Sequence, residues 1–185
     1  PLVTTADIPA TLGGRADHNV QNALFAVAIA FGLGAAVETA ASALRSFRMS
    51  VGDTPGRLNE ISGFPFRVIV DAAHNPHGCA ALVKFTDSLQ VSGRRILLMG
   101  ARGTLPDEDI IAMASAVAGH FDHYVAKNYH PDKMGNRATE EVPRMMRDEL
   151  VRRGVPGSCV TLSPDHLESV GVTLDMAGPG DLVVI

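Results

Sequence analysis

Apolar runs alternate with helix-like segments over most of the chain after residue 58. Four short runs rich in Val, Ile and Leu are each followed by a segment with helical periodicity, and a fifth run ends the sequence. Runs that are apolar along their whole length predict strands buried on both faces. We therefore expect an α/β, Rossmann-like, mostly parallel sheet with helices on both faces. Its strands are predicted at 67–71, 94–100, 122–127, 158–162 and 181–185, and its helices at 76–90, 107–118, 139–153 and 165–177.

The first fifty residues have a different pattern. Residues 19–33 are rich in Ala and aliphatic side chains and contain no Pro, which predicts a buried helix with Asn19 as its N-cap and Gly32 and Gly34 at its end. A second helix is predicted at 37–47. Residues 50–57 (SVGDTPGR) concentrate turn-forming residues, so we expect a domain boundary there, with residues 58–185 as a compact unit and residues 1–50 as a separate appendage.

Composition excludes several classes of function. The formal net charge is −4 and the basic residues are scattered, which argues against nucleic-acid binding. Cys79 and Cys159 are too far apart in sequence for a zinc motif, and they suggest a reduced, cytoplasmic setting. The most apolar stretch, 22–33, is too short to span a bilayer. Because the chain starts at Pro1 and stops within a predicted strand, we expect it to be a fragment of a longer protein.

Polar side chains follow the first predicted strand of the sheet, in residues 68–76 (VIVDAAHNP). Ligands bind at the carboxyl edge of open α/β sheets, so Asp71 is placed to accept hydrogen bonds from a ribose diol. His74 and Asn75 would face the same crevice. The alternative is that Asp71 and Asn75 merely cap the following helix, and the sequence leaves the two interpretations equally open.

Two further motifs contain candidate binding residues. Arg57 ends a PGR turn at the expected domain boundary, where its guanidinium could reach a nucleotide phosphate or ribose as two domains close. Taken alone, the motif favours an ordinary turn with a solvated Arg. His18, Asn19 and Asn22 open the first helix, and the two amides, one turn apart, could read the edge of an adenine. Capping explains Asn19 equally well, but it does not explain Asn22.

Together these motifs resemble the Mur ligase family. HNVQN at 18–22, PGR at 55–57 and DAAHNP at 71–76 follow the family's order at compatible spacing. The segments at 99–110, 135–142 and 177–185 look like the C-terminal domain of its cyanophycin synthetase branch. The resemblance implies that residues 1–54 are the helical end of the central ATPase domain and residues 55–185 the C-terminal domain. Ala72 departs from the family's usual aromatic, and Gly103 and the segment after Lys127 depart from the cyanophycin synthetase branch. These departures weaken the assignment of a poly-aspartate substrate but not that of a ligase.

The resemblance also implies an activity. Mur-type ligases use ATP to convert a carboxylate into an acyl phosphate, which the amine of an amino acid or peptide attacks to form an amide. The cofactors would be ATP and Mg²⁺, with the metal ligands outside this chain. No GxxxxGK[ST] phosphate loop occurs in the sequence, so the chain alone is expected to be inactive. The oligomeric state is left open, a homo-oligomer included.

Roles for individual residues follow from the same resemblance. His18, Asn19 and Asn22 would lie at the adenine, Arg57 and Asp71 at the ribose or phosphate, and His74 and Asn75 at the reacting groups. Lys127 and Arg137 would orient the carboxylate of the incoming amino acid. Two alternatives remain: a ligase like folylpolyglutamate synthase, which shares the DxAHNP pattern, and a non-catalytic nucleotide-binding module.

Overall fold

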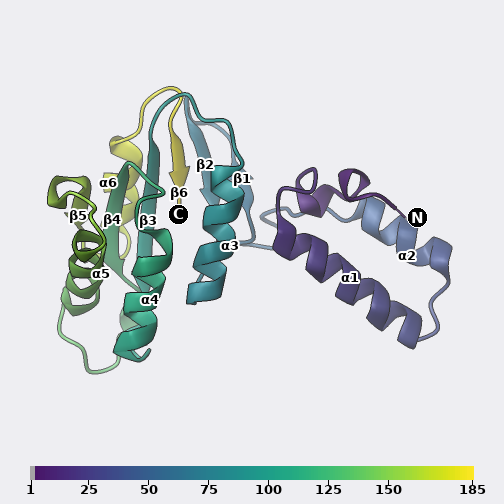
Figure 1. Cartoon of the computed structure of the whole chain (residues 1–185), viewed down its shortest axis with the longest axis horizontal. Helices are drawn as coiled ribbons and strands as arrows, with labels where there is room; N and C mark the ends of the chain where they lie inside the picture. Colours follow the sequence, from purple (N-terminus) through teal and green to yellow (C-terminus); the bar gives the residue numbers. More distant parts are fainter. Residues whose placement is uncertain (1–2) are drawn as a thin grey trace.

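The computed structural model describes residues 3–185 and contains one six-stranded sheet, in the order β1-β2-β6-β3-β4-β5 (Figure 1). All neighbouring strands pair in parallel except β1, which pairs antiparallel with β2. The strands are β1 (Asn59–Ile61), β2 (Arg67–Val70), β3 (Arg95–Ala101), β4 (His123–Asn128), β5 (Val160–Leu162) and β6 (Leu182–Val184). The helices are α1 (Asp17–Gly32), α2 (Val37–Ser46), α3 (Pro76–Asp87), α4 (Asp107–Val117), α5 (Glu141–Arg152) and α6 (Glu168–Asp175). Short 3-10 turns lie at Thr5–Asp7, Pro9–Thr11, Pro131–Lys133 and Gly157–Cys159.

Helices cover both faces of the sheet, which confirms the predicted fold class. In β3, Leu97 and Met99 belong to a large buried cluster that also takes side chains from α3, α4 and α5. Ile96 and Leu98 are equally buried but lie outside that cluster, because successive strand residues point to opposite faces. The helix α6 contacts β3 and covers the face opposite α3 and α4 (Figure 1). This two-sided burial explains why the strands are apolar along their length.

The strand β1 was not predicted. It is only three residues long and reads Asn-Glu-Ile, without an apolar run or a clear alternation. Its partner β2 fixes it in place, with Asn59 opposite Val70 and Ile61 opposite Val68. An edge strand of this kind depends on its neighbour more than on its own side chains, and local sequence therefore carries little signal for it.

The helices α1 and α2 form a hairpin beside the sheet (Figure 1). The prediction that the first helix is buried is wrong for this chain: no residue of α1 is buried, and Phe25 and Ile29 are 68% and 63% exposed. The reason is that α1 packs against α2 on one side and against α3 only near its start. Asn19 is not the N-cap either, because the helix begins at Asp17 and its N-cap is Ala16.

The hairpin meets the sheet through a small contact. Ala16, fully buried, joins the main buried cluster, and Asp17 forms an ion pair with Lys84 of α3. Leu12 and Met49 pack against the same cluster. The proposed division of the chain near residue 55 stays a prediction. No helix within residues 3–185 is long and apolar enough to cross a membrane.

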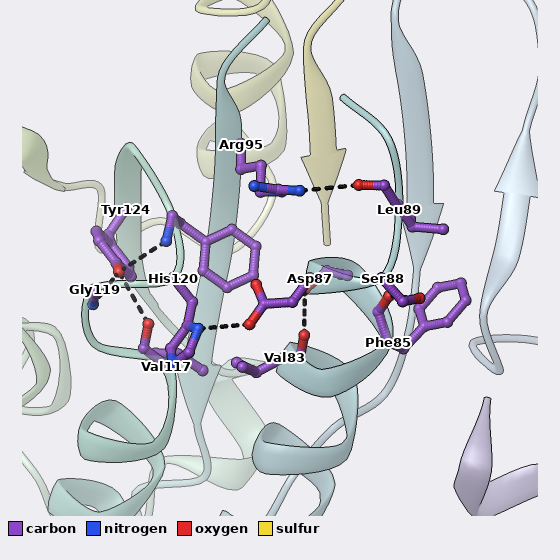
Figure 2. Close-up of polar contacts among 12 residues, drawn as sticks. Val83, Phe85, Asp87, Ser88, Leu89, Arg95, Val117, Gly119, His120 and Tyr124 are labelled. Atoms are coloured by element: carbon purple, nitrogen blue, oxygen red, sulfur yellow. Dashed lines mark hydrogen bonds and ion pairs between the residues drawn. The ribbon is translucent and has the colours of Figure 1, made fainter. Parts of the chain in front are cut away.

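A buried tyrosine fixes the connection between α4 and β4 (Figure 2). The Tyr124 side chain is fully buried, and its hydroxyl donates to the carbonyl of Val117 at 2.9 Å. The same oxygen accepts from the backbone amides of Gly119 at 2.8 Å and Phe121 at 3.2 Å. One hydroxyl therefore bonds to three backbone groups between the last residue of α4 and the start of β4.

We predict that Tyr124→Phe lowers the free energy of unfolding by about 1–3 kcal/mol, because it removes the hydrogen-bond acceptor of the Gly119 and Phe121 amides while keeping the ring. Urea unfolding followed by circular dichroism measures the change. Tyr129→Phe is the matched control, since it removes the hydroxyl of the chain's other tyrosine. Equal stability of Tyr124→Phe and the unaltered protein would contradict this role for the hydroxyl.

Candidate functional site

The carboxyl edge of the sheet begins at Asp71, the first residue after β2. Its Oδ2 accepts a hydrogen bond of 3.0 Å from the backbone amide of Leu58, and the amide of Ala72 donates to the carbonyl of Gly56 at 2.8 Å. These two bonds hold the PGR turn against the end of β2. The sequence therefore folds two of its three motifs into one unit.

The PGR turn is strained where it meets Asp71. Leu58 has a φ of 48°, in the left-handed region that a branched side chain rarely adopts, and its side chain is buried. Such a residue costs roughly 1–3 kcal/mol and persists only where its surroundings hold it. Here the bond to Asp71 and the burial of the leucine hold it. Asn59 helps, since its Oδ1 accepts from the amide of Gly56 at 2.7 Å.

The loop between β2 and α3 is ordered by its own side chains. Asn75 is the N-cap of α3, its Oδ1 accepting from the amide of Gly78 at 2.8 Å, and Pro76 occupies the first turn. The imidazole Nδ1 of His74 donates to the carbonyl of Ala72 at 2.8 Å. The capping interpretation is thus correct for Asn75, while Asp71 bonds across to Leu58 instead of capping the helix.

At the start of α1 the two predicted amides lie side by side. The Nδ2 of Asn22 donates to the Oδ1 of Asn19 at 3.2 Å, and the Nδ2 of Asn19 donates to the carbonyl of Ala10 at 2.8 Å. Asn19 therefore connects α1 to the preceding 3-10 turn and orients Asn22. This contact gives Asn22 a structural setting that the sequence did not suggest.

All seven residues predicted for nucleotide binding or catalysis line a single cleft of about 530 Å³ between the start of α1 and the loop after β2. They come from three separate motifs: His18, Asn19, Asn22, Arg57, Asp71, His74 and Asn75. Arg57 is exposed there. Within residues 3–185 its guanidinium makes one hydrogen bond, to the neighbouring carbonyl of Gly56 at 3.1 Å. The convergence is a property of the fold, because these motifs are up to 57 residues apart in sequence.

Burial and charge act in opposite directions on Asp71. Burial raises the pKa of its carboxyl above the ordinary value, while the hydrogen bond from Leu58 and the charges of His18 and Arg57 lower it. Burial is the larger effect. A carboxylate kept out of water in this way interacts strongly with any hydroxyl or cation that enters the cleft.

Lys127, at the end of β4, lies one step further along the carboxyl edge. It lines a small cavity of about 100 Å³ that Asp71 and His74 also line. Its Nζ donates to the Nδ1 of His166 at 3.2 Å and lies 5.5 Å from the centre of the Tyr129 ring. Burial lowers the pKa of this lysine. Its position beside the cleft is compatible with the predicted contact to a substrate carboxylate, which remains a prediction.

Arg137 is held by the protein itself. Its Nε donates to the carbonyl of Gly103 at 2.7 Å, and its two terminal nitrogens contact the carbonyl of Leu105, Asp107 and Glu141. These bonds and a contact to the sulfur of Met145 occupy the five N–H groups of a guanidinium. The side chain is 17% exposed, and the two acidic partners raise its pKa. A role in substrate binding stays a prediction, but the structure gives this arginine another task.

Sequence reasoning missed the residues that shape the site. Leu58 and Asn59 form the strained turn. Asn128 is the last residue of β4, and His166, which contacts Lys127, lies in the connection between β5 and α6. A buried polar residue ending an apolar strand, as Asn128 does, is a signal that could have been read. No group of three or more His, Cys, Asp or Glu side chains within residues 3–185 could hold a metal ion.

Comparison with known proteins gives one family for most of the chain. The family model described as "Mur ligase, glutamate ligase domain" matches residues 56–185. The cyanophycin synthetase of Nostoc sp. strain PCC 7120 is 35% identical over 182 residues, covering 96% of this chain and 19% of that protein. The UDP-N-acetylmuramyl-tripeptide synthetase of Roseiflexus sp. is 28% identical, covering 91% of this chain and 32% of that protein. The chain thus spans about a fifth of the length of the cyanophycin synthetases.

Solved structures share the fold at lower identity. Mycobacterium tuberculosis folylpolyglutamate synthase, solved with ADP and AMPPCP, has a TM-score of 0.68 at 20% identity, covering 92% of this chain and 37% of that one. UDP-N-acetylmuramate-alanine ligase of Thermotoga maritima has a TM-score of 0.61 at 20% identity, covering 90% of this chain and 33% of that one. At these identities the likeness concerns the fold alone.

We predict that Asp71→Asn and Asp71→Ala separate the two effects at this position. Asparagine keeps an acceptor for Leu58, whereas alanine removes it, so Asp71→Ala should be less stable than the unaltered protein by about 1–3 kcal/mol. Urea unfolding at several pH values measures both variants.

The pH dependence has a definite sign. A carboxyl whose pKa is raised by folding favours the folded state most when protonated, and that contribution is lost as the pH rises through the folded pKa. The stability of Asp71→Asn relative to the unaltered protein should therefore increase from about pH 3 to about pH 7. A difference that shrinks over this range would contradict burial as the dominant effect.

Proposed function

Because the chain belongs to the Mur ligase family, we propose that it is part of an ATP-dependent ligase that joins a carboxylate to the amine of an amino acid or peptide. The observation that carries the proposal is the cleft in which seven residues from three motifs converge. Similarity to the cyanophycin synthetases, at 35% identity over nearly the whole chain, supports that branch of the family. The activity would proceed through an acyl phosphate, whose attack by the amine yields the amide.

The side chains of the cleft suit a nucleotide. Amides such as Asn22 present both a donor and an acceptor, which the edge of an adenine requires. The exposed guanidinium of Arg57 can bind phosphate or ribose oxygens, and the partly buried carboxylate of Asp71 can accept from a ribose hydroxyl. In this proposal, Asn19 orients Asn22, and Asp71 fixes the turn that presents Arg57.

ATP would supply the phosphoryl group, and the residues of the cleft fit its nucleoside part. Within residues 3–185 no group of three or more His, Cys, Asp or Glu side chains could hold a metal ion, and we propose that the magnesium ligands lie outside this chain. We therefore assign to this chain contacts to the nucleoside part of the bound nucleotide and the orientation of the reacting groups by His74 and Asn75, while the phosphate loop lies outside it. We propose that a domain boundary near residue 55 lets these elements close over a bound nucleotide. The proposed cytoplasmic setting suits the two free cysteines.

We predict that Arg57→Ala raises the KM for ATP about tenfold or more in the natural protein, because it removes a charged contact to the nucleotide. Steady-state ADP formation in the presence of an acceptor peptide and an amino acid measures this change. Arg48→Ala is the matched control, since Arg48 is an exposed arginine outside the cleft that bonds to the carbonyl of Arg45. An unchanged KM for ATP in Arg57→Ala would contradict the assignment.

Product analysis separates the candidate ligases. Amide formation on an aspartate-rich peptide supports a cyanophycin synthetase-like enzyme, and glutamate addition to a folate supports the folylpolyglutamate synthase alternative. The 185-residue chain by itself should form neither product and should bind ATP weakly or not at all, because its sequence has no phosphate loop. Micromolar ATP affinity of that chain by calorimetry would contradict this division of labour.

A further inference from the structure

The PGR turn that carries Arg57 has an unusual backbone. Gly56 and Leu58, on either side of the arginine, have φ values of 69° and 48°, both in the left-handed region. Glycine adopts that region without steric cost, but a leucine there is strained, and such a turn keeps one shape only where other contacts hold it. The direction in which Arg57 leaves the turn therefore depends on what holds its two neighbours.

Two side chains divide the backbone groups of this turn between them. Asp71 accepts from the amide of Leu58 at 3.0 Å. Asn59 bonds to the groups on the other side: its Oδ1 accepts from the amide of Gly56 at 2.7 Å and from the amide of Arg57 at 3.4 Å. Its Nδ2 donates to the carbonyl of Arg57 at 3.4 Å. One amide side chain thus contacts both the N–H and the C=O of the arginine.

Asn59 is buried and is anchored independently of the turn. The residue is 2% exposed, and it begins β1, where it pairs with Val70 of β2. Asparagine is disfavoured in strands, and burying its amide is costly unless the amide finds partners. Within residues 3–185, every side-chain hydrogen bond of Asn59 goes to Gly56 or Arg57. A position that only filled space in the sheet would favour an apolar residue.

The side chain that leaves this turn is the one that reaches the cleft. Arg57 lines the cleft, whereas Asn59 does not. Within the described chain the guanidinium makes one hydrogen bond, to the carbonyl of Gly56 in the same turn. Because one bond leaves a long side chain considerable rotational freedom, the backbone that Asn59 holds decides which part of the cleft the guanidinium can reach.

We propose that Asn59 is a positioning residue for nucleotide binding: it holds the PGR turn in the conformation from which Arg57 reaches the nucleotide. The proposal rests on the ligase function proposed above, and it adds a residue outside the cleft that sets the affinity of the cleft for ATP. Asparagine suits this position because its amide accepts from one backbone group and donates to another.

The test compares Asn59→Ala and Arg57→Ala, alone and combined, in the natural protein. Asn59→Ala should raise the KM for ATP about threefold to tenfold, while kcat at saturating ATP stays within a factor of about two. In the Arg57→Ala background the same change should raise this KM by less than about twofold, because the side chain that it positions is gone. Equal rises in both backgrounds, an unchanged KM, or a fall in kcat alone each overturn the proposal.

Glu60→Ala is the matched control, at the next residue of the same strand. The exposed carboxylate of Glu60 pairs with Arg67 at 3.1 Å and lies outside the cleft, so its removal should leave KM and kcat unaltered. Asn59→Ser is a milder variant, whose shorter hydroxyl serves the turn less well than the amide. Its KM for ATP should lie between those of the unaltered protein and Asn59→Ala, and it takes the place of Asn59→Ala in the comparison if that variant does not fold.

A measurement on the 185-residue chain keeps this proposal distinct from the ligase activity. Amide hydrogen exchange followed by NMR should show the Gly56 amide exchanging about tenfold faster or more in Asn59→Ala. The Leu58 amide, which Asp71 holds, should keep its rate within a factor of about two. An unchanged rate for Gly56 overturns the role of Asn59 whatever the ligase activity. A natural protein that forms no amide product overturns the ligase proposal, while faster exchange of Gly56 would still support the hold of Asn59 on the turn.

Discussion

Asp71 accepts a hydrogen bond from the amide of Leu58, thirteen residues earlier in the chain, and the arrangement of the site depends on this bond. It fixes the turn that carries Arg57 against the end of β2, and with the bond from Ala72 to Gly56 it keeps a strained leucine in place. The loop with His74 and Asn75 begins directly after β2, and the sheet therefore positions this loop beside that turn. The start of α1 completes the cleft.

The carboxyl edge divides its polar side chains between two tasks. Some are occupied within the protein, as Arg137 is by two carbonyls, two carboxylates and a thioether, and they give the loops a fixed shape. Others remain available, as the exposed Arg57 does within the described chain. The first group explains the fixed shape of the loops at this edge, and the second group suggests what the cleft recognises.

The sequence predicted most of the fold because the sheet is buried on both faces. Strands such as β3 are apolar along their length, and Pro76 and Asn75 mark the start of α3 clearly. It failed where tertiary contacts decide: β1 has no pattern of its own, and α1 is apolar yet exposed in this chain. The cleft residues were predicted through ordered motifs. The bonds of Arg137 could not be, since they depend on distances between loops.

The central claim is that three distant motifs form one nucleotide-binding cleft between the start of α1 and the loop after β2. A crystal structure of the natural protein with a non-hydrolysable ATP analogue tests it most directly. The account predicts the adenine beside Asn19 and Asn22, with the ribose or phosphates within hydrogen-bonding distance of Arg57 and Asp71. A nucleotide bound elsewhere, with these side chains left to solvent, would contradict it.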